Sequence, residues 1–487
     1  MFRRMPRAQW LAVALLLYFL YFFRLTGAGM LGPDEPRYAS IGRAMASSGD
    51  WITPRLWGEP WFEKPALLYW LTGAAFRAGL PDDLAPRLPV AILGAVFLLF
   101  FYWTLRREFG SRAACFATVI LGTSAGWLGL SYVAVTDMPL AATFSAAMLL
   151  CLPWIQKGDP RRLPAAAALL ALAVLAKGLV PLVLAAPLLW CGRRRLTDLL
   201  KPRVAGAFAL VAMPWYVLCY ARNGFVFLQK FFWQHQFERF ASDALQHVQP
   251  FWFYAPVLLA ALFPWTPVLA LLARRSLYSD ARRRFLLALL GFGFLFFSAS
   301  TNKLPGYLLP LVPAAAALLG LALDEAREAR PVLAGCALLL LLMPALTAVL
   351  PQALAVGLSR AHFPPFAWTW LVPALLAIAV WRLGRGAAVA VLVLGVSAGV
   401  VFLKVEALPA IDRAVSARPL WREIAPRRDQ VCVTEMHRNW LYGLNYYSVT
   451  PLPDCSWQPK PLRIGQAPGR PPVLLQPGVE IPNAAPD

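Results

Sequence analysis

The sequence predicts an all-α, multi-pass membrane protein with about 13 transmembrane helices, followed by a small C-terminal α/β domain. Three observations predict this fold class. Hydrophobic residues make up 59% and charged residues only 15% of the 487 residues, and the mean hydropathy is +0.57, unlike soluble proteins. Apolar runs of about 20 residues, the length that spans a bilayer, recur from Trp10 to about Lys404. Beyond that point the chain is polar and rich in proline.

The distribution of basic residues predicts how the spans are oriented in the membrane. The formal charge of +21 does not indicate a nucleic-acid partner, because the arginines lie in short clusters between apolar runs. Short cytoplasmic loops carry an excess of Lys and Arg, so all clusters are placed on one side, with a cytoplasmic N-terminus. The expected spans are residues 9–30, 88–105, 113–131, 138–155, 163–176, 178–191, 204–221, 251–273, 285–300, 304–323, 331–350, 366–381 and 386–403. The short segment 66–80 is interpreted as an interfacial or re-entrant helix.

This alternation places four polar and aromatic loops on the opposite side of the membrane. They are residues 31–87, 131–137, 223–250 and 301–307. For a bacterial inner membrane that side is the periplasm, and the C-terminal tail falls there too because it follows an odd number of spans. We therefore expect a transmembrane catalytic domain over residues 1–404, with residues 31–87 as its first periplasmic loop, and a periplasmic domain over residues 405–487.

The tail contains short runs of β-branched and aromatic residues, as in VCVTEMHRNWLYGLNYYSV, which favour a small α/β or mostly β domain. Cys432 and Cys455 are the cysteines that lie outside the apolar spans. In an oxidising compartment they could form a disulfide; a buried pair of free thiols is the alternative.

The first periplasmic loop is the predicted place of the chemistry. Ionisable groups are costly in a membrane protein and are usually kept for function, and residues 31–65 carry five of interest: Asp34, Glu35, Arg37, Glu63 and Lys64. Carboxylates such as Asp34 and Glu35 can act as a general base or bind a cation. Two alternatives need no chemistry. Asp34 or Glu35 could cap a helix that begins near Pro36, and Glu63 and Lys64 could form an exposed surface pair.

Cations expected on the same side of the membrane suggest a phosphate-bearing substrate. Lys64, Lys177 and Lys303 can hold phosphate as point charges, and Arg239 can do so as a two-pronged donor. A lipid-linked phosphate that enters from the bilayer fits both these cations and the membrane setting. Glu63 and His235 are candidate ligands for a divalent metal ion, although a lone histidine in an aromatic loop is more often structural.

Six ordered segments carry a resemblance to a known family. They are GPDEPRYA, GDWITPRLWGEPWFEKPALLYW, TDMPL, AKGLVPLVLAAP, FFWQHQFERF and STNKLPGYLLPLVP. In this order they resemble the aminoarabinose transferase and protein-mannosyltransferase-like superfamily of GT-C glycosyltransferases, over residues 10 to about 320. The resemblance implies a multi-span helical bundle with periplasmic juxtamembrane helices and a small C-terminal periplasmic domain. It also implies an inverting enzyme with a polyprenyl-phosphate-linked sugar as donor.

The resemblance also assigns roles to individual residues. Asp34 resembles the family's catalytic carboxylate, and Asp137 resembles a second acid of that site. Lys64 resembles a ligand of the donor phosphate, and Glu63 an active-site acid or metal ligand. Arg239, Lys303 and Tyr307 resemble further phosphate contacts. Glu35, Arg37, Tyr38 and Lys177 complete the expected substrate-binding set.

The identity of the acceptor stays open at this stage. Lipid A or a related envelope lipid or glycan is the leading candidate, and transfer to a protein hydroxyl, as by a protein O-mannosyltransferase, is the alternative. An acceptor phosphate is already ionised, so Asp34 would only position it, whereas an acceptor hydroxyl needs a base. A lipid flippase is the rival of a different class, but it is expected to carry inverted repeats and broken helices near the membrane midplane.

Overall fold

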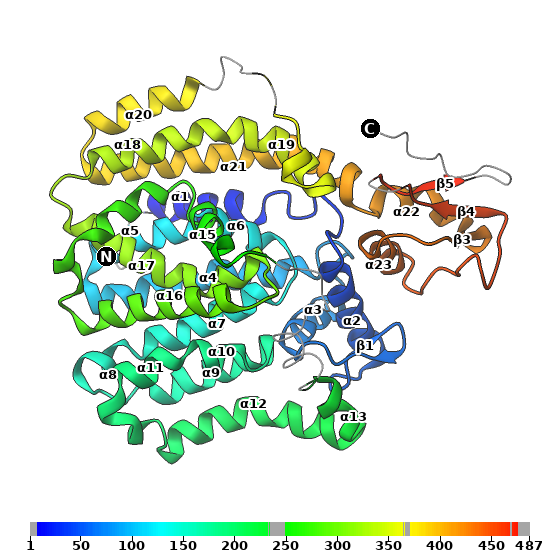
Figure 1. The fold of residues 1–487 in the computed structure, drawn as a ribbon, viewed down its shortest axis with the longest axis horizontal. Coiled ribbons are helices and arrows are strands. Elements are labelled where there is room, and N and C mark those ends of the chain that lie inside the picture. The colour runs from blue at the N-terminus through cyan, green and yellow to red at the C-terminus, as the bar shows by residue number, and fades with distance from the viewer. Residues whose placement is uncertain are drawn as a thin grey trace.

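The structure is a computed structural model that describes residues 7–231, 233, 249–363, 365, 371–467 and 470–475. Long helices lie side by side in a bundle, and a small domain that contains a sheet lies beyond one end of it (Figure 1). The same end of the bundle carries α2 (Asp34–Ser48) and α3 (Leu67–Arg77). With eleven residues, α3 is too short to cross a bilayer and packs against α2.

The described helices of the bundle follow the apolar runs of the sequence. They are α1 (Arg7–Leu17), α4 (Arg87–Phe109), α5 (Ser111–Gly122), α6 (Ala125–Tyr132), α7 (Asp137–Leu150), α8 (Leu152–Lys157), α9 (Leu163–Lys177), α10 (Val180–Leu184), α11 (Ala186–Cys191), α12 (Pro202–Asn223), α13 (Phe225–Leu228), α15 (Tyr254–Ala261), α16 (Ala281–Ala299), α17 (Val312–Glu325), α18 (Arg330–Leu339), α19 (Met343–Val356), α20 (Val372–Arg382) and α21 (Arg385–Val415). Short 3-10 or π turns extend several of them, including η2 (Tyr18–Phe22), η6 (Thr266–Ala273) and η8 (Pro305–Leu311).

Among the described residues, six helices are long and apolar enough to cross a membrane, or eight if each of two bent pairs forms one span. Four shorter apolar helices lie at Trp10–Phe22, Leu163–Lys177, Val180–Cys191 and Pro373–Arg382. The protein is therefore a helical, multi-pass membrane protein, and the count of about 13 spans stays a prediction.

Two of the expected spans are bent where the sequence predicts continuous helices. The axes of Ser111–Gly122 and Ala125–Tyr132 differ by 53°, and those of Phe251–Ala261 and Thr266–Ala273 by 109°. The two breaks lie against each other: the Ala125 amide donates to the Phe263 carbonyl (2.9 Å), and the Trp265 indole N–H donates to the Thr123 hydroxyl (2.8 Å). Polar backbone groups freed inside a membrane bundle need such partners.

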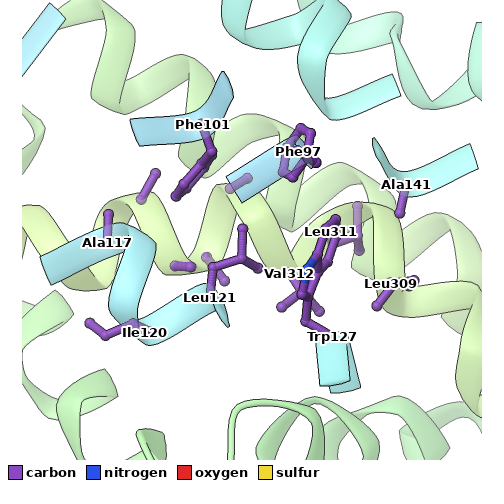
Figure 2. Packing of buried hydrophobic residues seen from close by; sticks show 14 of the residues in the cluster. Phe97, Phe101, Ala117, Ile120, Leu121, Trp127, Ala141, Leu309, Leu311 and Val312 are labelled. Atoms are coloured by element: carbon purple, nitrogen blue, oxygen red, sulfur yellow. The ribbon is translucent and has the colours of Figure 1, made fainter. Parts of the chain in front are cut away.

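The bundle core is apolar and continuous. Phe97 and Phe101 of α4, Leu121 of α5 and Val312 of α17 belong to one buried cluster (Figure 2). Trp127 of α6 is fully buried, with its ring centroid 5.0 Å from that of Phe97. This packing holds the ends of α4, α7 and η8 in place, and those ends carry the candidate site.

The basic clusters gather at the end of the bundle opposite α2 and α3. Arg282, at the start of α16, pairs with Glu108 of α4 (3.3 Å). Arg112 of α5 pairs with Asp324 of α17, whose carbonyl oxygen accepts a hydrogen bond from Arg385 of α21 (2.6 Å). Loops that are far apart in the sequence therefore meet on one basic face, as the alternation of the clusters predicts.

The C-terminal domain consists of α22 (Arg418–Ile424), α23 (Arg438–Tyr447) and a three-stranded sheet of β3 (Val431–Val433), β4 (Leu462–Gly465) and β5 (Val473–Leu475). The strand order is β3-β4-β5, parallel between β3 and β4 and antiparallel between β4 and β5. Cys432 and Cys455 form a disulfide. The expected boundary at 404/405 lies inside α21, which continues to Val415.

Candidate functional site

The first acid of the site lies in the first turn of α2. The helix begins at Asp34 with Pro33 as its N-cap residue, so Asp34 does not cap the helix through its side chain. A carboxylate in this position is stabilised by the helix dipole. The Asp34 side chain is 36% exposed, which leaves it open to a substrate, and it forms an ion pair with Arg37 one turn later.

Arg37 joins Asp34 to the second acid of the loop. Its Nη2 lies 3.1 Å from Glu63 Oε2, and the other oxygen of Glu63 lies 3.2 Å from Lys64 Nζ. Glu63 is only 3% exposed, so these cations compensate the cost of burying its charge. The hairpin of β1 (Arg55–Leu56) and β2 (Glu59–Pro60) precedes Glu63 and Lys64 in the same loop.

Aromatic rings surround the Arg37 guanidinium. It lies 5.3 Å from the ring centroid of Tyr38, 5.5 Å from that of Trp61 and 5.7 Å from that of Tyr442 of α23. Burial alone would lower the pKa of Arg37, but Glu63 and the other neighbours raise it above its ordinary value. Arg37 therefore stays charged at every pH at which the protein is folded.

Several donors around Arg37 have no acceptor. Among the described residues, the Nε of Arg37, the indole nitrogens of Trp57 and Trp61 and the hydroxyl of Tyr69 are buried without a hydrogen-bond partner. Buried polar groups are normally paired, and each exception needs an explanation. An oxygen-rich ligand at this position would supply the missing acceptors.

Glu35 differs from its neighbour Asp34. It is fully buried and accepts two 2.7 Å hydrogen bonds from the buried Arg87, one from the Leu31 amide (2.8 Å) and one from the Ala134 amide (2.9 Å). Both of its oxygens are thus used within the protein. We therefore revise the expectation that Glu35 binds substrate: it joins the start of α2 to the start of α4.

A second acid–cation pair lies on neighbouring elements. Asp137 is the first residue of α7 and Lys177 the last residue of α9, positions that the helix dipoles favour for these charges. Lys177 Nζ lies 2.7 Å from Asp137 Oδ1 and 4.4 Å from the ring centroid of Tyr307. Gly306 lies so close to this pair that a Cβ there would be 3.2 Å from the Asp137 carboxylate.

Two contacts place this pair next to the first loop. The Ala134 amide, three residues before Asp137, donates to Glu35, the neighbour of Asp34. Phe62 of the loop and Leu175 of α9 belong to one buried apolar cluster. The acids and cations that the sequence assigned to separate loops therefore line one region of the molecule.

Lys303 is buried near the same end of the bundle. Its ammonium donates to the backbone carbonyls of Gln249 (2.9 Å) and Ser300, and the residue is 5% exposed. Arg239 and His235, the remaining expected contacts, lie outside the described residues.

Of the two candidate metal ligands, Glu63 lies within the described residues and His235 does not. No group of three or more His, Cys, Asp or Glu side chains suited to a metal occurs within the described ranges. Glu63 itself lies beside two cations, Arg37 and Lys64, whose charges oppose a further cation.

Sequence reasoning did not single out three residues that support the site. Arg87, at the start of an apolar span, carries a signal, because an ionisable residue in a membrane segment usually has a role. Trp61 and Tyr442 carry none, because aromatic residues are common at membrane interfaces. Tyr442 also reaches the site from a domain about 400 positions along the chain.

Comparison with known proteins shows what the chain is similar to. A profile of the dolichyl-phosphate-mannose-protein mannosyltransferase family matches residues 63–218. The undecaprenyl phosphate-alpha-4-amino-4-deoxy-L-arabinose arabinosyl transferase of Edwardsiella ictaluri is 34% identical over 318 residues, which are 62% of this chain and 57% of that protein. The Pseudomonas aeruginosa (strain UCBPP-PA14) enzyme of the same name is 32% identical over 66% of this chain and 60% of its own length.

A solved structure extends this similarity over nearly the whole chain. ArnT from Cupriavidus metallidurans bound to undecaprenyl phosphate superposes with a TM-score of 0.73 at 26% identity, over 95% of this chain and 87% of that chain. The chain is thus similar to GT-C aminoarabinose transferase-like proteins over most of its length, and the resemblance expected from the sequence is confirmed.

More distant similarity within the GT-C fold concerns the fold alone. The archaeal oligosaccharyltransferase AglB from Archaeoglobus fulgidus superposes with a TM-score of 0.51 at 14% identity. The matched segments span 57% of the Edwardsiella ictaluri protein and 60% of the Pseudomonas aeruginosa protein, less than two thirds of either.

Proposed function

We propose that the protein is an inverting glycosyltransferase that moves a sugar from undecaprenyl phosphate to lipid A or a related acceptor of the cell envelope. The observation that carries the proposal is the chain of ion pairs Asp34–Arg37–Glu63–Lys64 beside the pair Asp137–Lys177. Relatives named for undecaprenyl phosphate-linked aminoarabinose support the donor, as does the similar structure that binds undecaprenyl phosphate.

In this proposal the cations hold the donor. Lys64 and Lys177 bind the phosphate, with Lys303, Tyr307 and Arg239 as further contacts. Negative charge grows on the phosphate as the glycosidic bond breaks, so cations fixed in advance stabilise the transition state. The unpaired donors of Trp61 and the Arg37 Nε fit the oxygen atoms of a sugar or phosphate.

Asp34 acts on the acceptor. Its partial exposure lets it contact the incoming oxygen, while the ion pair with Arg37 fixes its position. It removes a proton if the acceptor is a hydroxyl, or orients the acceptor if that group is an ionised phosphate. Asp137 positions Lys177, and Glu63 positions Arg37 and Lys64.

The second candidate for the acceptor is a protein hydroxyl. The profile that matches residues 63–218 describes protein mannosyltransferases, and this favours a peptide Ser or Thr as the alternative to a lipid. Lipid A ranks first because the named relatives are aminoarabinose transferases.

The proposed setting is a bacterial inner membrane with the N-terminus in the cytoplasm and the C-terminus in the periplasm. Basic loops gather at the opposite end of the bundle from the site, which agrees with the positive-inside rule. The Cys432–Cys455 disulfide lies at the end with the site, as an oxidising periplasm would allow. Residues 1–404 form the proposed transmembrane catalytic domain with about 13 spans, and residues 405–487 the periplasmic domain.

We further propose that Glu63 acts as the ion-pair partner of two cations and that His235 does not complete a metal site with it. Dialysis of the purified protein against a chelator is expected to leave transfer unchanged. Loss of transfer that returns on addition of a divalent ion would contradict this part of the proposal.

The test is transfer by purified protein from undecaprenyl phosphate-linked sugars to lipid A, other lipids and peptides. Wild-type protein is expected to form product, while Asp34→Asn and Lys64→Ala each lose about 100-fold or more in rate. Glu59→Gln is the matched control, because Glu59 is an exposed carboxylate of the same loop.

Two results would contradict the proposal. Equal rates for Asp34→Asn and Glu59→Gln would remove the role of Asp34. Protein-dependent movement of lipid across vesicles, with no product from any donor, would favour the flippase.

A further inference from the structure

A cavity lined by arginines and apolar side chains lies at the basic end of the bundle, far from the candidate active site. It has a volume of about 700 Å³ and opens between α8, α11 and the start of α16, at the opposite end of Figure 1 from α2 and α23. Its lining is Trp154, Ile155, Trp190, Cys191, Gly192, Arg193, Arg194, Arg195, Arg284, Leu287 and Ala288. The proposed transferase reaction uses none of these residues.

The charge of the cavity is strongly positive. Arg193, Arg194, Arg195 and Arg284 line it, and within the described part of the chain none of the four forms a salt bridge with a carboxylate. The acid of the same turn, Asp198, is already bound by Lys201 (2.7 Å) and by the Trp154 indole (3.0 Å). Arg284 donates to the Tyr278 and Ser279 carbonyls. Four guanidinium groups without a salt bridge around one opening favour an anion, and arginine suits phosphate best.

The packing beneath the arginines is close. The Trp154 ring lies so near Gly192 that a Cβ on Gly192 would come within 2.1 Å of it. The Arg195 guanidinium lies against Gly158, where a Cβ would come within 2.7 Å, and donates to the Trp154 carbonyl (3.2 Å). Because Gly158 has no side chain, the Arg195 guanidinium can pack directly against it, and the hydrogen bond to Trp154 holds Arg195 there. Arg195 therefore forms a fixed wall of the cavity.

The other walls of the cavity are apolar and face outward. Trp190 is 68% exposed and Leu287 is 38% exposed, and the partly buried Ala288 lies in the same lining. Exposed Trp beside Arg is typical of the membrane interface, where the indole lies at the depth of the head groups. A soluble anion would satisfy only the arginines, whereas a lipid satisfies the apolar wall as well.

We propose that this cavity binds an anionic phospholipid of the bilayer, with its phosphate among Arg193, Arg194 and Arg284 and its acyl chains along Trp190 and Leu287. Basic pockets between membrane helices are known to bind acidic head groups. The charges of the cavity and of the lipid are complementary, and no acid of the described residues competes for the arginines at salt-bridge distance.

The experiment compares lipid binding to full-length protein in detergent by native mass spectrometry, with phosphatidylglycerol and phosphatidylcholine as probes. The test variant is Arg193→Gln with Arg194→Gln, because these exposed side chains make no hydrogen bond within the described structure and their loss should not affect folding. The control is Arg106→Gln with Arg107→Gln, which removes the same charge at the same end of the bundle but outside the cavity lining.

We expect wild type and control to retain phosphatidylglycerol in preference to phosphatidylcholine. The test variant is expected to bind phosphatidylglycerol about tenfold more weakly or worse. Equal weakening in both double variants would assign the effect to general surface charge and overturn the proposal. Displacement of the lipid by millimolar inorganic phosphate would also overturn it, because the site would then belong to a soluble anion.

Discussion

Asp34 and Glu35 are neighbours in the chain but have opposite surroundings. Asp34 is partly exposed beside Arg37, whereas Glu35 is fully buried and its oxygens accept hydrogen bonds from Arg87 and two backbone amides. The sequence motif contains both acids and does not distinguish them. Only the fold brings Arg87, which is 52 positions away, against one acid and not the other.

This difference predicts separate effects of two conservative substitutions. Glu35→Gln should lower the free energy of unfolding by about 3 kcal/mol or more, because it leaves the buried Arg87 without its counter-charge. Asp34→Asn should leave stability within about 0.5 kcal/mol and slow transfer about 100-fold. Thermal melting and transfer rates measured on the same preparations check both, and a stable but inactive Glu35→Gln would contradict the assignment.

The stability of the protein at alkaline pH depends on two buried tyrosines of the site, Tyr38 and Tyr69. Burial, and after it the charge of Glu63, raises the pKa of Tyr38 and of Tyr69 well above the ordinary value of 10.0. Above pH 10 the unfolded state loses these protons while the folded state keeps them, so stability should fall as pH rises, by about 1.4 kcal/mol per tyrosine and pH unit.

Tyr69→Phe tests this pH dependence. Above pH 10 the free energy of unfolding of the variant should fall less steeply with rising pH than that of wild type. The variant should not lose stability at neutral pH, because the Tyr69 hydroxyl has no partner among the described residues. Thermal melts from pH 8 to 11.5 provide the measurement. A variant with the same alkaline slope as wild type would show that Tyr69 ionises while the protein is folded.

At the scale of elements, the apolar runs predict the helices, but they do not predict where a helix bends. The run 251–273 is apolar throughout and was expected to form one span, yet it folds back by 109°. The bend depends on hydrogen bonds with the break between α5 and α6, a contact between segments about 140 positions apart. Composition carries no information about such a contact.

Close packing between α5 and α17 provides a prediction at this scale. A Cβ on Gly320 would lie 2.4 Å from the backbone nitrogen of Ala117. Gly320→Ala should therefore force the two helices apart and cost about 3 kcal/mol or more. Gly291→Ala in α16 is the control, since a Cβ there meets nothing within 4 Å, and it should be neutral or slightly stabilising. Thermal melting of both variants is the measurement, and equal melting temperatures would contradict the close packing.

At the scale of the whole molecule, the C-terminal domain is fixed to the first loop. Arg418 pairs with Asp83 (2.6 Å) and Asp412 (2.8 Å), and the Tyr447 hydroxyl donates to Asp83 (2.7 Å). These contacts bring α23 and its Tyr442 to Arg37. The sequence predicts a small domain after the spans, but not that it contributes to the site, because its contacts join residues more than 300 positions apart.

The orientation of the molecule is testable by labelling. Asp82→Cys lies on the side of the site and Arg194→Cys at the basic end. In intact spheroplasts a membrane-impermeant thiol reagent should modify Asp82→Cys and reach Arg194→Cys only after lysis, with the wild-type cysteines as background. Labelling of Arg194→Cys from outside would reverse the proposed topology.

The central claim is that Asp34 acts on the acceptor while Lys64 holds the donor phosphate, and single-turnover transfer from undecaprenyl phosphate-linked 4-amino-4-deoxy-L-arabinose tests it most directly. With donor in excess over its dissociation constant, Asp34→Asn should bind the donor as wild type does and react about 100-fold more slowly. Lys64→Ala should bind undecaprenyl phosphate about tenfold more weakly or worse. Wild-type reaction rates in Asp34→Asn, or unchanged binding in Lys64→Ala, would contradict the account.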